Sequence, residues 1–178
     1  MKKTLILAGI LLLAIAGCAK EDAYVEPEAF SFVVYPNSRY LGELTELTRQ
    51  AHKLVKPNEE PPPIAIYDTE APLEEVAAFY ARSYGYENVA PDATNNLSAT
   101  KPPAFYRTGD LQADVKTIAE QLPTLGVNAD LSKAQGAYRA AEIGARTNRP
   151  HVTIQRPYFN VKTSEVVDRT IIWMARVR

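Results

Sequence analysis

The last third of the chain alternates apolar and polar residues, and this period of two constrains the fold more than any other feature of the sequence. The alternation runs through HVTIQRPYF, 151–159, and through VVDRTIIWMARV, 166–177. Successive side chains of a strand point to opposite faces, so both stretches are predicted strands with one apolar side. The preceding stretch 137–146 suits a helix or a strand, and we favour a strand. Together the three stretches predict an antiparallel meander, in which Pro157 marks an edge or a bulge because it lacks an N–H to donate.

The first half of the chain carries the helical period of three to four residues instead. The expected elements are, in order, a strand over 30–35, a helix over 41–55, a strand over 64–69, a helix over 71–86, a loop over 87–104 and a helix over 110–126. Asp110 is the expected N-cap of the third helix, and Gly85 is the expected terminator of the second. The sequence therefore predicts an α+β domain, in which one or two N-terminal strands join the C-terminal meander and the helices pack on one face.

The N-terminus has the pattern of a secretory signal. Lys2 and Lys3 precede an apolar run of 12 residues, 5–16. A helix needs about 20 apolar residues to span a bilayer, so this run is too short to be a stable membrane anchor. A positive head, a short apolar segment and small residues after it are typical of a signal peptide.

The run ends at Cys18, the only cysteine of the chain. The residues Ile15, Ala16, Gly17 and Cys18 resemble the lipobox of bacterial lipoproteins. That resemblance implies a diacylglycerol on the Cys18 sulfur, cleavage before the cysteine, and in most cases a further acyl chain on the new amino end. Two or three acyl chains would hold the protein at a membrane without a spanning helix. The alternative is an ordinary signal peptide followed by an incidental cysteine.

The expected organisation is a signal peptide at 1–17, a lipidated cysteine and tether at 18–29, and a single globular domain at 30–178. Ala19 stands where Asp favours retention in the inner membrane of enterobacterial lipoproteins, so we expect the periplasmic face of the outer membrane. Removing residues 1–17 leaves 161 of 178 residues and changes the net charge from −1 to −3. This charge argues against nucleic acid as a partner.

The sequence holds few residues of the kinds that catalyse reactions or bind metals. The two histidines, His52 and His151, do not form an HxH, HExxH or CxxC spacing with any other ligand, so no metal is expected. No glycine-rich phosphate loop is present, and no cofactor is expected. A hydrolase would require His52 or His151 to meet a serine and an aspartate in the fold.

The densest polar and aromatic group lies in the C-terminal strands. We take Arg156, Tyr158 and Arg169 as candidate binding residues, because two guanidinium groups beside a tyrosine suit an anion or a peptide carboxylate. The alternative is a solvated sheet edge on which the arginines pair with Glu165 and Asp168 across strands.

Three segments resemble a group of uncharacterised bacterial lipoproteins and periplasmic domains: YPNSRYL at 35–41, YDTEAPLEEVAAFYARSYGY at 67–86, and RPHVTIQRPYFNVKTSEVVDRTIIWMAR at 149–176. The resemblance covers roughly 55 of the 161 residues after the leader. It implies the α+β fold and the envelope location, and it brings no catalytic residues.

We therefore expect a membrane-anchored lipoprotein with a non-enzymatic binding or structural role, whose partner is another envelope protein or the cell wall. One alternative is a small-molecule or lipid-binding module with a pocket between helices and sheet. A hydrolase is the other.

Overall fold

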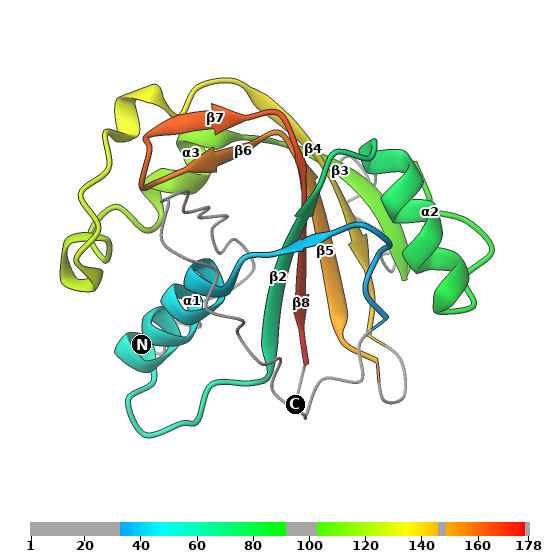
Figure 1. Cartoon of the computed structure of the whole chain (residues 1–178), viewed down its shortest axis with the longest axis horizontal. Coiled ribbons are helices and arrows are strands. Elements are labelled where there is room, and N and C mark those ends of the chain that lie inside the picture. The colour runs from blue at the N-terminus through cyan, green and yellow to red at the C-terminus, as the bar shows by residue number, and fades with distance from the viewer. Residues whose placement is uncertain (1–32, 92–102, 146–148, 177–178) are drawn as a thin grey trace, which may run out of the picture.

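The computed structural model describes residues 33–91, 103–145 and 149–176, which form one antiparallel sheet with helices around it (Figure 1). The sheet has six strands in the order β1-β2-β8-β5-β4-β3, and a two-stranded pair, β6-β7, stands apart from it. The strands are β1 (Arg39–Tyr40), β2 (Ile64–Thr69), β3 (Ala104–Asp110), β4 (Ala137–Ile143), β5 (His151–Arg156), β6 (Tyr158–Asn160), β7 (Glu165–Val167) and β8 (Thr170–Ala175). The helices are α1 (Gly42–Val55), α2 (Leu73–Ser83) and α3 (Leu111–Lys116), with 3-10 turns at Pro123–Leu125 and Leu131–Lys133. The predicted α+β class is confirmed.

Helices cover both faces of the sheet, whereas the sequence predicts them on one. The α1 face carries Ile66 and Ile171 and is covered by α1, α3 and β6. The α2 face carries Tyr67 and Ile172 and is covered by α2. The reason lies in the central strands, because all six residues of β2 are buried. A strand that is apolar on both sides needs a cover on both sides.

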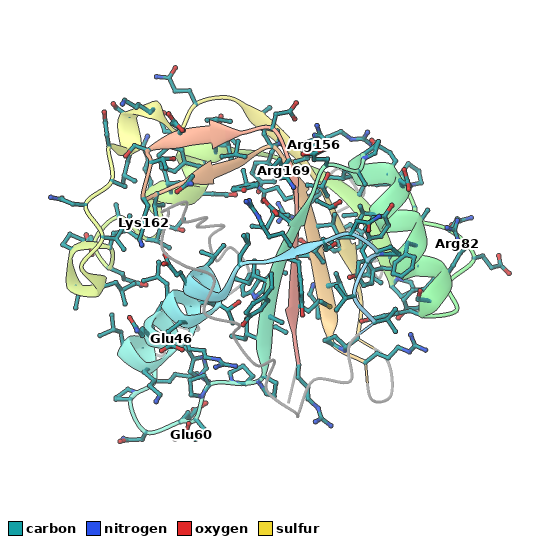
Figure 2. The ribbon with its side chains drawn as sticks, viewed as in Figure 1. Glu46, Glu60, Arg82, Arg156, Lys162 and Arg169 are labelled. Carbon is teal, nitrogen blue, oxygen red and sulfur yellow. The ribbon has the colours of Figure 1, made fainter. Side chains whose placement is uncertain are left out.

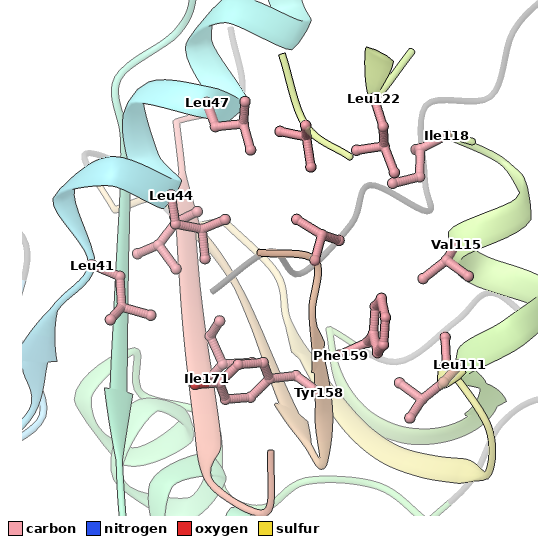
Figure 3. Packing of buried hydrophobic residues seen from close by; sticks show 14 of the residues in the cluster. Leu41, Leu44, Leu47, Leu111, Val115, Ile118, Leu122, Tyr158, Phe159 and Ile171 are labelled. Atoms are coloured by element: carbon pink, nitrogen blue, oxygen red, sulfur yellow. The ribbon is translucent and has the colours of Figure 1, made fainter. Parts of the chain in front are cut away.

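Apolar side chains from distant parts of the chain fill the α1 face (Figure 3). Those labelled there come from α1 and its preceding residue, from α3 and the turn after it, from β6 and from β8: Leu41, Leu44, Leu47, Leu111, Val115, Ile118, Leu122, Tyr158, Phe159 and Ile171. Most are nearly or completely buried. Each fully buried side chain of this size contributes roughly 1.5–3 kcal/mol relative to exposure, so this layer holds α1, α3 and β6 on the sheet.

The helix signals of the sequence match the structure closely. Asp110 caps α3, and its carboxylate accepts a hydrogen bond of 2.9 Å from the Ala113 N–H. Gly85 follows α2 with a φ of 72°, a left-handed conformation that glycine adopts without steric cost. The third helix is shorter than predicted, because regular α-helix ends at Lys116.

The strands differ more from the prediction. The meander is confirmed as β4-β5-β8, but the segment between β5 and β8 forms the separate β6-β7 pair. Residues 33–35, the described part of the predicted first strand, are not a strand, and β1 pairs later, at Arg39 and Tyr40. The sequence does not predict β3. The predicted signal peptide at 1–17 and the cysteine with its tether at 18–29 lie outside the described residues.

The backbone of Gly109 on β3 lies against the side chain of Tyr138. A Cβ built at this position would overlap the ring and hydroxyl of Tyr138, which is buried. We therefore expect Gly109→Ala to lower the free energy of unfolding by about 1–3 kcal/mol through overpacking. Urea denaturation followed by circular dichroism measures this loss. The double variant Gly109→Ala/Tyr138→Leu should lose less than the two single losses added, and strict additivity would contradict the proposed clash.

Candidate functional site

The structure brings two of the three predicted binding residues, Tyr158 and Arg169, onto one buried carboxylate that the sequence analysis did not single out. This carboxylate is Asp68 of β2, whose side chain is 0% exposed. Arg169 donates from Nε to Asp68 Oδ2 at 3.0 Å, and the Tyr158 hydroxyl donates to the same oxygen at 3.2 Å. Burial and the neighbouring charge of Asp68 both raise the pKa of Tyr158, so its phenol stays protonated and donates.

Arg39 of β1 completes this group, which we call the Asp68 cluster (Arg39, Asp68, Tyr158, Arg169). Its guanidinium binds both oxygens of Asp68, from Nε at 3.1 Å and from Nη2 at 2.7 Å. A buried carboxylate is costly unless it is paired and hydrogen-bonded, and here two cations and one hydroxyl satisfy it. The cluster therefore joins β1, β2, β6 and the start of β8.

Arg156, the third predicted residue, lies beside this cluster at the end of the sheet where β2 leads into α2 (Figure 2). It donates to Asp168 Oδ1 at 2.7 Å and to the backbone carbonyls of Asp168, Glu70 and Ala71. Arg169 also pairs with Glu70, at 2.7 Å. Arg39, Arg156 and Arg169 thus pair with three carboxylates of the same chain, those of Asp68, Glu70 and Asp168. The pairing of an arginine with Asp168, which the sequence offers as an alternative, is found. Glu165 lies opposite Asn160 in the β6-β7 pair.

A second polar group lies on the same face, on β3, β4 and β5. We call it the Glu142 cluster (Arg107, Glu142, His151, Thr153). Arg107 donates from Nε to Glu142 Oε1 at 2.7 Å, and Thr153 donates to Oε2 at 2.7 Å. His151 Nε2 lies 2.8 Å from Oε2, a contact in which an imidazole N–H donates. Burial alone would raise the pKa of Glu142, but the hydrogen bonds from His151, Arg107 and Thr153 outweigh it and lower the pKa below its usual value.

The Glu142 cluster belongs to a row of directly opposed residues that crosses five strands. Phe105 pairs with Glu142, Glu142 with Thr153, Thr153 with Trp173, and Trp173 with Ile66 of β2. Directly opposed residues of antiparallel strands place their side chains on the same face, so Phe105 and Trp173 flank Glu142 and Thr153 there. Trp173 is the only tryptophan of the chain. Its indole nitrogen is shielded from solvent and has no hydrogen-bond partner among the described residues.

The histidines do not assemble a hydrolytic triad within the described residues. Thr153 and His151 both approach the same oxygen of Glu142, so the imidazole does not accept a proton from the hydroxyl, as nucleophile activation requires. His52 lies on α1, and its Nε2 has no partner in the described part of the chain. Across 33–91, 103–145 and 149–176, no three His, Cys, Asp or Glu side chains stand close enough to hold a metal ion.

The comparisons with known proteins identify no relative. No protein-family model, no curated protein and no solved structure matches the chain.

The Asp68 cluster predicts a large difference between two aspartates. Asp68→Asn keeps the shape of the side chain but leaves two arginines without their buried counter-charge, and we expect a loss of about 3 kcal/mol in the free energy of unfolding. Asp168→Asn is the matched control, because Asp168 pairs with Arg156 but is 80% exposed, and its loss should be far smaller. Urea denaturation measures both, and equal losses would contradict the structural role of Asp68.

The lowered pKa of Glu142 implies that the stability of the fold depends on pH in the acid range. Because its pKa is lowered in the fold, its ionised form stabilises the protein above the pKa of the unfolded chain, and this stabilisation is lost as the pH falls through the folded pKa. Glu142→Gln should be less stable than wild type at about pH 7 and should lose less further stability between about pH 5 and pH 3. Thermal melts across this range test the point, and parallel curves for the two proteins would refute it.

Proposed function

We propose that this chain is a bacterial lipoprotein, held in the cell envelope by acyl chains on Cys18, whose folded domain binds another envelope component. The observation that carries the proposal is the sequence of Ile15, Ala16, Gly17 and Cys18 directly behind an apolar run of 12 residues. The Cys18 thiol is the group that would accept the lipid. The apolar run is too short to span a bilayer stably.

The distance between anchor and domain is limited by the chain itself. Fifteen residue steps separate Cys18 from Val33, the first described residue, and a fully extended chain covers about 50 Å over that length. Val33, where the described domain begins, would therefore lie within about 50 Å of the membrane that holds the acyl chains. Ala19 after the cysteine favours the periplasmic face of the outer membrane. No helix within the described ranges is long and apolar enough to cross a membrane.

Binding is favoured over catalysis by how the polar side chains are engaged. In the Asp68 cluster the two guanidinium groups neutralise a carboxylate of the same chain. This cluster therefore holds strands of the fold together. In the Glu142 cluster Thr153 and His151 are both fixed on one carboxylate oxygen. Such an arrangement suits a prepared surface that recognises a ligand or an envelope partner, because its side chains are already oriented before contact.

Mass spectrometry of the mature protein from membranes tests the anchor. We expect an N-terminal Cys18 that carries a diacylglycerol thioether, and incorporation of labelled palmitate that Cys18→Ser abolishes. The double variant Cys18→Ser/Ser31→Cys is the matched control, because it restores a single thiol outside the lipobox and should take up no label. An unmodified Cys18 behind an uncut leader would overturn the proposal.

A further inference from the structure

We propose that residues 33–38 form a strap, which α2 holds through Tyr35 and which opens as a unit while the rest of the domain stays folded. An open strap lengthens the tether between membrane and domain, and this consequence, unlike the strap itself, rests on the anchor proposed above. The strap runs beside α2 before the chain passes through β1 into α1 on the other face of the sheet (Figure 1).

Tyr35 holds the strap on α2 through two hydrogen bonds and one ring contact. Its backbone N–H donates to the Tyr80 hydroxyl at 3.2 Å, and its ring stands edge-on to Phe79 at a centroid distance of 5.1 Å. Its own hydroxyl donates to the carboxylate of Glu75. That hydrogen bond above all raises the pKa of Tyr35, so the phenol stays protonated near neutral pH and keeps donating.

A tight turn behind Tyr35 gives the strap a shape of its own. The Ser38 N–H donates to the Tyr35 carbonyl at 3.2 Å and closes the turn over Pro36 and Asn37. Proline restricts its own φ to about −65°, and Asn37 has a φ of 58°, a left-handed conformation that asparagine tolerates. Because this turn is formed by neighbouring residues, it does not depend on contact with α2.

The strap ends at Arg39, where the chain becomes fixed to the sheet. Arg39 binds both oxygens of the buried Asp68, and the Leu41 N–H donates to the Ile66 carbonyl at 2.8 Å. Residues 33–38, by contrast, belong to no helix or strand, and each of them is half-buried or exposed. Segments with few buried groups open at a much lower free energy than the core does, so opening should stop at Arg39.

The helix that holds the strap is itself held by the sheet. Val76 and Ala77 of α2 are completely buried in the α2-face core, and α2 contacts β4 and β5 directly. Neither contact involves the strap. We therefore expect α2 to stay in place when Tyr35 leaves it.

Opening changes the length of chain between the anchor and the fixed part of the domain. With the strap closed, the tether ends at Val33 and extends to at most about 50 Å. With the strap open, the tether ends at Arg39, which is 21 residue steps from Cys18, and extends to about 70 Å. The strap thus changes the reach of the domain by about 20 Å.

Amide hydrogen exchange tests the opening, because it reports the equilibrium between closed and open states residue by residue. The mature full chain is measured in detergent micelles. In Glu75→Ala the amides of Tyr35 and Ser38 should exchange about fivefold faster than in wild type, the change expected for the loss of one hydrogen bond. The amide of Leu41 should keep its wild-type rate, because opening ends at Arg39.

Glu74→Ala is the matched control. Glu74 is the neighbouring exposed glutamate of α2, and its carboxylate pairs with Arg139 rather than with the strap. The amides of Tyr35 and Ser38 should therefore keep their wild-type rates in this variant. Tyr35→Phe removes the hydrogen bond from its other side, so combining it with Glu75→Ala should give no further increase. Thermal melts check that each variant is folded.

Energy transfer to a bilayer tests the length of the tether. The lipidated protein carries a donor dye at the exposed site Lys133→Cys and is placed in vesicles with an acceptor dye on the lipid headgroups. Tyr35→Asp removes the ring and sets a second carboxylate beside Glu75, so it should hold the strap open and lower the energy transfer. Val33→Asp adds the same charge at an exposed position and should leave the transfer unchanged.

Two results would overturn the strap: equal exchange of the Tyr35 and Ser38 amides in Glu75→Ala and Glu74→Ala, or faster exchange that extends to Leu41. Equal energy transfer in Tyr35→Asp and Val33→Asp would overturn its effect on the tether. Failure of the protein to bind vesicles would overturn the lipid anchor instead, and the exchange rates would still decide on the strap.

Discussion

A carboxylate buried away from water must be compensated by the chain that buries it, and the compensation of Asp68 determines how the parts of this fold are joined. Arg39 comes from β1, Arg169 from the residue before β8, and Tyr158 from β6. β1 is only two residues long, so its ladder alone holds it weakly and the Arg39 pair fixes it to β2. One carboxylate therefore ties the first strand, a central strand and the β6-β7 pair together.

The two polar clusters share the α1 face but link different parts of the fold. Asp68 is 0% exposed and is held by Arg39 and Arg169, with Tyr158 of β6 on the same carboxylate. Glu142 is 14% exposed, and its partners come from the neighbouring strands β3 and β5. The first cluster therefore ties separate elements to the sheet, and the second links adjacent strands within it.

The sequence predicts the local elements better than it predicts the site. Periodicity places β2 at 64–69, because a run of apolar residues between breakers leaves little choice. β3 is not predicted, since Arg107, Thr108 and Gly109 interrupt any alternation. The clusters are out of reach because their partners are distant in sequence: Asp68 lies 29 residues from Arg39 and 101 from Arg169. The available signal is a lone acidic residue inside an apolar strand, which must find a cation to be buried.

The most direct test of the role of Asp68 is amide hydrogen exchange, which reports local opening of the fold strand by strand. Exchange is measured for wild type and for Asp68→Asn under conditions in which both proteins are folded. We expect Asp68→Asn to raise the exchange rates of amides in β1 and β6 more than those of β4, because β1 and β6 are held by partners of Asp68 and β4 is not. Equal protection of β1 and β6 in the two proteins would contradict this role.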